Sequence, residues 1–369
     1  MAGIMASAMK GVGRITAGDL PALREFQRAQ FGLDALQLDN SHHRWLFDET
    51  PFIDPEGPQL WICRRDDQVV GQQGGIPFTL AAGAQDLSAS WAIDLMVAPQ
   101  WRLRGVGPAL SSAHLAARDV TVSLSLTDAA FKSYRRAGWL DLGNEPSFVR
   151  VIDPVRCLKV SPYDGGMARM AARGARPMLS SLSLGLSAAS RLGRSKLVEI
   201  DRFTPQADEL WQACRPHIAC AARRDHAFLR WRFDESPQAP LFSRFAMMQQ
   251  DQMMAYAVLR HDLLSGEEVA VVCDYLARPG WLFPLFAQLT EQARREGAAA
   301  LLCRTLNQQA IRPLSMLGFL TLRNGFRQPT RMMVKPRSDD PALVSLLGNP
   351  RNWFVTVADS DMGFSPLGG

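Results

Sequence analysis

The stretch from Asp94 to Leu110 has the residue types and spacing of a site for a phosphate or diphosphate group. An apolar strand pattern ends before Pro99, a turn carries Gly105 and Gly107, and an apolar helix pattern follows. Exposed N–H groups at a helix N-terminus, where the helix dipole is positive, attract anions, and glycine lets a ligand approach the backbone. Pro108 removes one donor but pre-sets the helical φ. The turn has neither the third glycine of a dinucleotide-binding loop nor the G-K-S/T of a Walker loop. The pattern therefore predicts an anion site of another class.

Two motifs resemble the GNAT superfamily of acyl-CoA-dependent N-acyltransferases. The family motif Q/R-x-x-G-x-G/A is met by Arg102, Gly105 and Gly107, directly after LMVAP. The family's next motif, N-x-x-A-x-x-x-Y-x-x-x-G-F, is similar to TDAAFKSYRRAGW at residues 127–139, which places Tyr134 at the tyrosine position. The chain has only four tyrosines, so this match adds weight. The resemblance covers residues 15–152, and residues 197–335 show a weaker similarity to the same family. The arrangement resembles the tandem GNAT proteins of bacteria.

The resemblance implies direct transfer of an acyl group, acetyl by default, from acyl-CoA to a small-molecule or peptide amine. Backbone N–H groups near Met96 and Val97 are expected to hold the thioester oxygen, and Tyr134 is expected to give a proton to the departing thiolate. Positioning of the two substrates is expected to supply much of the rate. No metal is implied. The residues expected to bind the cofactor are Met96, Val97, Arg102, Leu103, Arg104, Gly105, Val106, Gly107, Thr127 and Ala130.

Asp94 is the candidate general base, because it stands just before the segment expected to hold the thioester oxygen. It could take the amine proton directly or through water. The alternative is a purely structural carboxylate. Asp274, which takes the place of Asp94 in the internal repeat described below, favours this alternative. His42 and His43 stand near the expected acceptor entrance, where a pair of exposed helix histidines is the favoured interpretation. For Tyr134, core packing is the alternative to catalysis, and the glycine turn favours catalysis.

An internal repeat organises the chain. RWLFDETP at residues 44–51 returns as RWRFDESP at residues 230–237, and DLMVAP at 94–99 returns as DYLARP at 274–279. When the second copy is aligned so that residue 274 matches residue 94, Leu282, Leu285 and Ala287 stand at the positions of Arg102, Gly105 and Gly107. In the same alignment, Leu314 stands at the position of Tyr134. The second copy is therefore interpreted as a degenerate GNAT-like domain without a second active site.

Each copy shows strand patterns first and then strand, helix, strand, helix and strand, which predicts a mixed α/β fold. Each domain is expected to be a mixed, mostly antiparallel sheet flanked by helices, and the first copy's last strand is expected near 147–152. The expected organisation is a flexible N-terminus (1–14), a catalytic domain (15–152), a basic linker with short helices (153–196), the degenerate domain (197–335) and a C-terminal tail (336–369).

Composition excludes several classes of protein. The chain has 369 residues, of which 47% are hydrophobic and 21% charged, so it can bury two cores and is not a disordered chain. No apolar run is long enough to span a membrane, and the six cysteines show no metal-ligand or disulfide spacing. A cytoplasmic protein is expected.

The basic charge is confined to one segment. Eight basic residues stand against Asp164 between positions 154 and 196, which exceeds the net charge of +5 of the whole chain. No nucleic-acid partner is therefore expected. A solvated linker is favoured over an amphipathic helix lying on a membrane, and either a monomer or a homodimer is consistent with the sequence.

Two other functions stay open. One is a non-catalytic CoA-binding or scaffold protein that keeps the fold. The other is an aminoacyl transferase of the Fem type, which has a double-GNAT architecture, but the intact glycine turn argues against it because those enzymes do not need a CoA loop.

Overall fold

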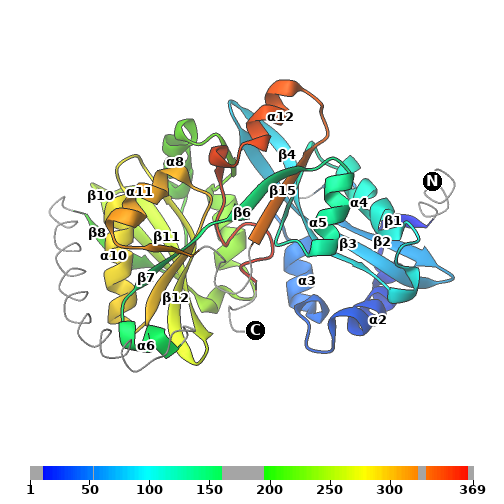
Figure 1. The fold of residues 1–369 in the computed structure, drawn as a ribbon, viewed down its shortest axis with the longest axis horizontal. Helices are drawn as coiled ribbons and strands as arrows, with labels where there is room; N and C mark the ends of the chain where they lie inside the picture. The colour runs from blue at the N-terminus through cyan, green and yellow to red at the C-terminus, as the bar shows by residue number, and fades with distance from the viewer. Residues whose placement is uncertain (1–10, 53, 160–194, 323–329, 365–369) are drawn as a thin grey trace. The chain divides into compact units, whose positions relative to one another are not determined.

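A computed structural model describes residues 11–52, 54–159, 195–322 and 330–364 (Figure 1). The described chain forms two compact units. The first contains residues up to 143, residues 235–237 and 331–349, and the second contains the remainder. Most of the basic segment between the copies (160–194), the first ten residues and the last five lie outside the described residues.

The first unit contains a mixed sheet with strand order β1–β2–β3–β4–β5–β15–β6. Its pairs β1–β2, β2–β3, β3–β4 and β5–β15 are antiparallel, and β4–β5 is parallel. The strands are β1 (Val12–Arg14), β2 (Leu60–Arg65), β3 (Gln68–Ala82), β4 (Gln85–Val97), β5 (Val120–Leu124), β6 (Leu140–Glu145) and β15 (Thr330–Pro336). The helices are η1 (Ala17–Asp19), α2 (Leu20–Phe31), η2 (Leu36–Leu38), α3 (Asn40–Phe47), η3 (Pro99–Trp101), α4 (Val106–Ala116), α5 (Asp128–Arg136) and α12 (Pro341–Gly348).

The alternation of side chains along β2 places helices on both faces of this sheet. Leu60 and Ile62 pack in one cluster with Leu23 and Phe26 of α2. Trp61 and Cys63, which point to the other face, pack in a second cluster with Val106 and Leu110 of α4. Successive residues of a strand face opposite sides, so α2 and α4 cover opposite faces.

The second unit contains a sheet of order β14–β7–β13–β12–β11–β10–β8. Only β12–β13 is parallel among its described pairs. The strands of this sheet are β7 (Ser147–Val151), β8 (Lys196–Ile200), β10 (Phe242–Gln249), β11 (Gln252–Leu264), β12 (Glu267–Ala277), β13 (Ala300–Arg304) and β14 (Leu320–Leu322). The second unit also contains the short parallel pair β9 (Cys220–Ala222) and β16 (Trp353–Phe354), which lies outside this sheet. Its helices are α6 (Pro154–Lys159), α8 (Gln206–Cys214), η4 (Arg215–His217), α9 (His226–Leu229), η5 (Arg230–Asp234), η6 (Ala239–Leu241), α10 (Leu282–Arg295), α11 (Gln308–Met316) and η7 (Pro350–Asn352). The predicted mixed α/β class, with sheets flanked by helices, is confirmed.

The two halves of the chain exchange one strand each, which the sequence analysis did not predict. The strand expected at 147–152 to complete the first copy is β7, and it pairs with β13 in the second unit's sheet. The place beside β5 is taken by β15 from the end of the chain, from Met332 opposite Leu124 to Pro336 opposite Val120. A short apolar strand fits the exposed edge of either sheet, so its side-chain pattern alone does not select the partner.

Candidate active site

The parallel strands β4 and β5 part at the position where the sequence analysis expects the thioester. Their described pairing runs from Ala89 opposite Val120 to Trp91 opposite Val122, whereas β4 continues to Val97. A β-bulge lies in this free stretch, because the register with β3 slips between Gln72 and Gly74. Bulges bend a strand and re-aim its groups. The end of β4 therefore diverges from β5.

Asp94 stands in the bulge with a φ of 51°, a left-handed value that is uncommon outside glycine. Buried Gln73 fixes the bulge, since its Nε2 donates to the carbonyl of Ile93 at 2.7 Å. The Asp94 carboxylate accepts a hydrogen bond from Nε2 of Gln37 at 2.9 Å. The backbone carbonyl of Asp94 accepts from Nε2 of Gln72 at 3.5 Å, and Gln72 in turn accepts from Gln27 of α2. The candidate base is thus held by neutral amides.

The predicted anion loop follows directly after β4. Leu103 has a φ of 62° and its side chain is fully exposed, and Gly105, the N-cap of α4, has a φ of 83°. Nε of Arg102 donates to the carbonyl of Val97 at 3.0 Å, and the Arg104 guanidinium lies over the Trp101 ring. The first-turn N–H groups of α4 point toward the loop because a helix leaves its first donors unpaired. These donors and two arginines fit a diphosphate group.

Tyr134 of α5 is buried beside the diverging strands. Its ring stacks on Trp139 at 4.2 Å between centroids, in a cluster that also contains Met333. Leu95 of β4 and Leu126, just past β5, pack against that cluster. Burial raises the pKa of Tyr134 to about 12, and the hydrogen bond with Ser111, which lowers the pKa, offsets only part of this rise. The phenol therefore keeps its proton at any ordinary pH.

Thr127 and Ala130 lie where α5 begins. The Thr127 hydroxyl caps the helix by accepting from the Ala130 N–H at 3.3 Å. Met96 and Val97 are half-buried on the free stretch of β4. The ten residues expected to bind the cofactor, with Tyr134 and Asp94, thus lie along the end of β4, the loop, and α5 with its N-cap, all in one unit.

The histidine pair differs from the expectation. His42 is buried, with its ring 5.5 Å from that of Trp45, so it is not an exposed helix residue. His43 is half-buried against Phe47. Burial lowers the pKa of His43 to about 4, and nearby Arg24 adds to this effect.

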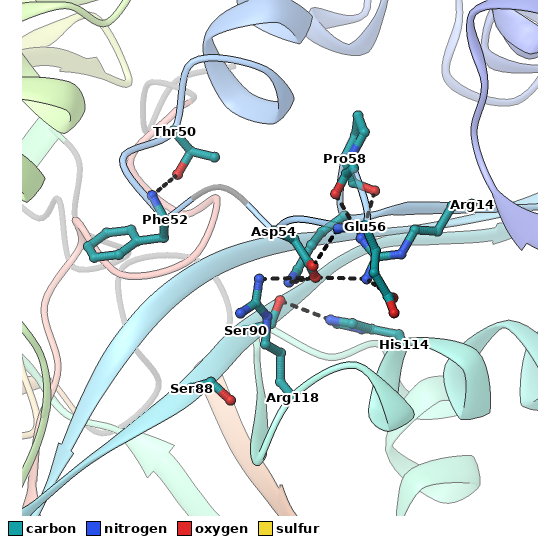
Figure 2. Close-up of polar contacts among 12 residues, drawn as sticks. Arg14, Thr50, Phe52, Asp54, Glu56, Pro58, Ser88, Ser90, His114 and Arg118 are labelled. Carbon is teal, nitrogen blue, oxygen red and sulfur yellow. Dashed lines mark hydrogen bonds and ion pairs between the residues drawn. The ribbon is translucent and has the colours of Figure 1, made fainter.

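A buried polar cluster, missed at the level of sequence, lies on the α4 face of the sheet (Figure 2). Nε2 of His114 lies 2.9 Å from Oγ of Ser90, and burial lowers the pKa of His114 to about 3. Asp54 binds the guanidinium groups of Arg14 and Arg118 at 2.7 and 3.2 Å. A cavity of about 160 Å³ lies next to Asp54, between the end of α3 and β3. Ser90, a polar residue inside an apolar strand pattern, was the available signal.

In the second unit, α10 begins at Leu282, the position that matches Arg102. Leu285 and Leu314, which match Gly105 and Tyr134, are completely buried. The matching aspartate, Asp274, is also completely buried, and it binds Arg224, Tyr256 and Thr356. Asp274 is therefore a structural carboxylate.

No family model and no curated protein matches the sequence. Similar folds are found among solved structures. A GCN5-related N-acetyltransferase from Anabaena variabilis is 13% identical, with a TM-score of 0.59, over 88% of this chain and 72% of that one. A GCN5-related N-acetyltransferase from Kribbella flavida is 14% identical, with a TM-score of 0.56, over 88% and 70%. N-myristoyltransferase of Saccharomyces cerevisiae with bound myristoyl-CoA is 10% identical, with a TM-score of 0.54, over 88% and 82%.

The chain therefore has the GCN5-related N-acetyltransferase fold. Among the described helices, none is both long and apolar enough to cross a membrane. The described residues also contain no cluster of three or more histidine, cysteine or acidic side chains that could hold a metal ion.

Proposed function

We propose that the first unit is an acyl-CoA-dependent N-acyltransferase that moves an acyl group, acetyl by default, to a primary amine. One observation carries the proposal: β4 leaves β5 at a bulge and runs directly into a glycine turn at the N-terminus of α4. This arrangement offers an extended binding path that ends on a set of anion-binding donors. Acyl-CoA, when bound, supplies an activated thioester carbonyl.

The loop would hold the diphosphate. Residues Leu103 to Gly107 offer backbone N–H groups, and Arg102 and Arg104 add positive charge. A Cβ at Gly107 would meet nothing closer than Cγ2 of Val97 at 3.8 Å, so its open side can admit a ligand. Thr127 and Ala130 would line the path where α5 begins.

Val97 is the better donor for the thioester oxygen. The Ala98 N–H bonds to the carbonyl of Val70 on β3. Since backbone N–H groups alternate along a strand, the Val97 N–H is directed to the opposite edge, toward β5. The Met96 N–H is directed to β3 by the same rule, so Met96 would contribute by packing.

Tyr134 would protonate the departing sulfur. Its pKa of about 12 makes it a weak acid, but burial raises the pKa of the thiols of Cys214, Cys220 and Cys273 to about 12 as well. In an equally dry site, a thiolate and the phenol would therefore compete for the proton on similar terms. Asp94 would accept the proton of the amine, directly or through one water.

Acetyl-CoA binding tests the proposal directly. Calorimetry on the wild type should give one site per chain, and a Gly105→Glu, Gly107→Glu double variant should abolish it because two carboxylates repel the diphosphate. Gly32→Glu is the matched control, since Gly32 has a φ of 93° and nothing within 4 Å of an added Cβ. A folded protein that binds neither acetyl-CoA nor longer acyl-CoAs would exclude the proposal. Binding without release of free CoA in an amine screen would instead indicate a CoA-binding protein without catalysis.

A further inference from the structure

The C-terminal segment Trp353–Ser360 is completely buried in the second unit. Its first two residues form β16, which runs parallel to β9 with Trp353 opposite Cys220 and Phe354 opposite Ala221. All eight residues of the segment are buried. A chain end that follows an exposed Arg351 and is then buried without a break needs a partner for each of its backbone groups.

β9 pairs with the first two residues, and the ends of β12 and β13 bind the backbone further along the segment. The described pairing of β12 with β13 stops at Val272 opposite Cys303. Beyond it, the Ala358 N–H donates to the carbonyl of Cys273 at 2.8 Å, on the side of β12. On the side of β13, the Leu306 N–H donates to the carbonyl of Val355 at 3.1 Å, and Thr356 forms an antiparallel bridge with Thr305. The segment therefore lies between the two strands where they part.

Side chains hold the segment at two residues. Oγ1 of Thr356 donates to Asp274 at 2.7 Å, and the carboxylate of Asp359 binds Arg224. The Arg224 guanidinium also binds Asp274 and lies over the Phe354 ring, 4.5 Å from its centroid. The side chains of this ion-pair network have no exposed area. A buried carboxylate without Arg224 would be strongly unfavourable, so Asp359 specifies how the segment is bound.

An aromatic side chain fills the rest of the space. The Phe354 ring packs 5.2 Å from that of Tyr275, whose hydroxyl lies 3.0 Å from Oγ1 of Thr305. Next to Phe354, a cavity of only about 20 Å³ remains, bordered by Leu282 and Asn307. That volume suffices for about one water.

We propose that the cleft between β12 and β13 is a peptide-binding site, and that the chain's own segment Trp353–Ser360 is its ligand. The ligand class is a peptide that is extended at an aromatic anchor and turns after a hydroxyl residue, with a carboxylate in the turn; these groups bind as Phe354, Thr356 and Asp359 do. The backbone joins the ends of the two strands through the Ala358 N–H on the side of β12 and the Val355 carbonyl on the side of β13. The matching strands of the first unit, β4 and β5, part in the same way. This inference rests on the contacts of the second unit and not on the proposed acyl transfer.

The test uses the full chain with a protease site inserted after the exposed Asn349. After cleavage, the fragment from Pro350 onward should co-elute with the rest of the protein in gel filtration. A fluorescein-labelled synthetic peptide of residues 350–369 should then exchange into the cleft, and fluorescence anisotropy should report its binding. The same peptide with Asp359→Asn should bind at least about tenfold more weakly, because the buried Arg224 loses one of its two carboxylate partners. The uncleaved insertion variant is the control and should take up no labelled peptide.

Three results would overturn the inference. The first is loss of the fragment after cleavage without uptake of the labelled peptide by protein that keeps its circular dichroism spectrum. The second is equal binding of the Asp359→Asn peptide, and the third is no exchange at all. Acetyl-CoA binding plays no part in this readout, so a failed acyltransferase test leaves it unaffected.

Discussion

The side-chain amide of Gln37 donates a hydrogen bond to Oδ1 of Asp94 at 2.9 Å, across a separation of 57 residues in the chain. Asp94 occupies the bulge where β4 leaves β5. Its backbone carbonyl is bound by Gln72, which is bound by Gln27 in turn. Neutral amides therefore bind Asp94 at two places: Gln37 at its carboxylate and Gln72, supported by Gln27, at its backbone carbonyl. The hydrogen bond from Gln37 orients this carboxylate.

Replacement of Gln37 by leucine should shift the pH profile of acyl transfer. The lost amide stabilises the charged form of Asp94, so its removal raises the pKa of the carboxyl. The acidic limb of kcat/KM against pH should move up by about 1 unit, because a hydrogen bond to a charged group contributes about 1.5 kcal/mol. Asp94→Asn should lower kcat by a factor of about 10² or more. An unchanged profile in Gln37→Leu would assign the titrating base to another group.

Removal of one hydroxyl should separate catalysis from binding at Tyr134. Tyr134→Phe keeps the ring that stacks on Trp139, so the fold and the affinity for acetyl-CoA should change little. The kcat should fall by a factor of about 10² if the phenol protonates the sulfur. The loss of one hydrogen bond with Ser111 should cost at most about 1.5 kcal/mol of stability. Steady-state kinetics measures the kcat, and calorimetry on the same sample measures the affinity for acetyl-CoA. A kcat within twofold of wild type would assign Tyr134 to core packing.

A methyl group at Gly75 should destabilise the first unit. A Cβ there would lie 2.6 Å from Oγ of Ser90 and 2.7 Å from Nε2 of His114, inside the buried polar cluster of Figure 2. Gly75→Ala should lower the free energy of unfolding by about 1–3 kcal/mol, measured by urea unfolding. Gly18→Ala is the control, because its Cβ would meet only Oγ1 of Thr16 at 3.9 Å. Equal stability of the two variants would mean that the residues of the cluster move aside for the methyl group at little cost in free energy.

The local part of the candidate site could be predicted from the sequence. The apolar helix pattern after the glycine turn predicted α4, which begins at Val106, and Gly105 before it has a positive φ. Such features depend on a few neighbouring residues: a glycine for the turn, Thr127 as a cap, and apolar spacing for the helix. The likeness of the fold to acetyltransferases followed from the same motifs.

The long-range part could not be predicted. The exchange of β7 and β15 depends on which sheet edge each strand meets, and Phe148 or Met333 would be buried equally well in either sheet. The partners of Asp94 come from residues 27, 37 and 72, and no spacing rule links these positions. Asp359 lies in the segment that was predicted only as a C-terminal tail, and it is buried because Arg224, far away in sequence, neutralises it. Contacts of this kind exist only after the chain has folded.

His114 should make the protein sensitive to mild acid. Burial holds its pKa at about 3, against 6.5 for a free histidine. Below pH 6.5 the unfolded chain therefore binds a proton that the native state does not take up, and stability falls with pH until about pH 3. The loss is about 1.4 kcal/mol per pH unit, or about 2 kcal/mol at pH 5. His114→Gln, whose amide can still reach Ser90, should lose about 2 kcal/mol less than wild type between pH 7.5 and pH 5 in urea unfolding. The pKa of His43 is also lowered. His43 contributes the same loss of stability in wild type and in the variant, so the difference between their losses comes from His114. Equal losses in wild type and variant would show that His114 is protonated at little cost.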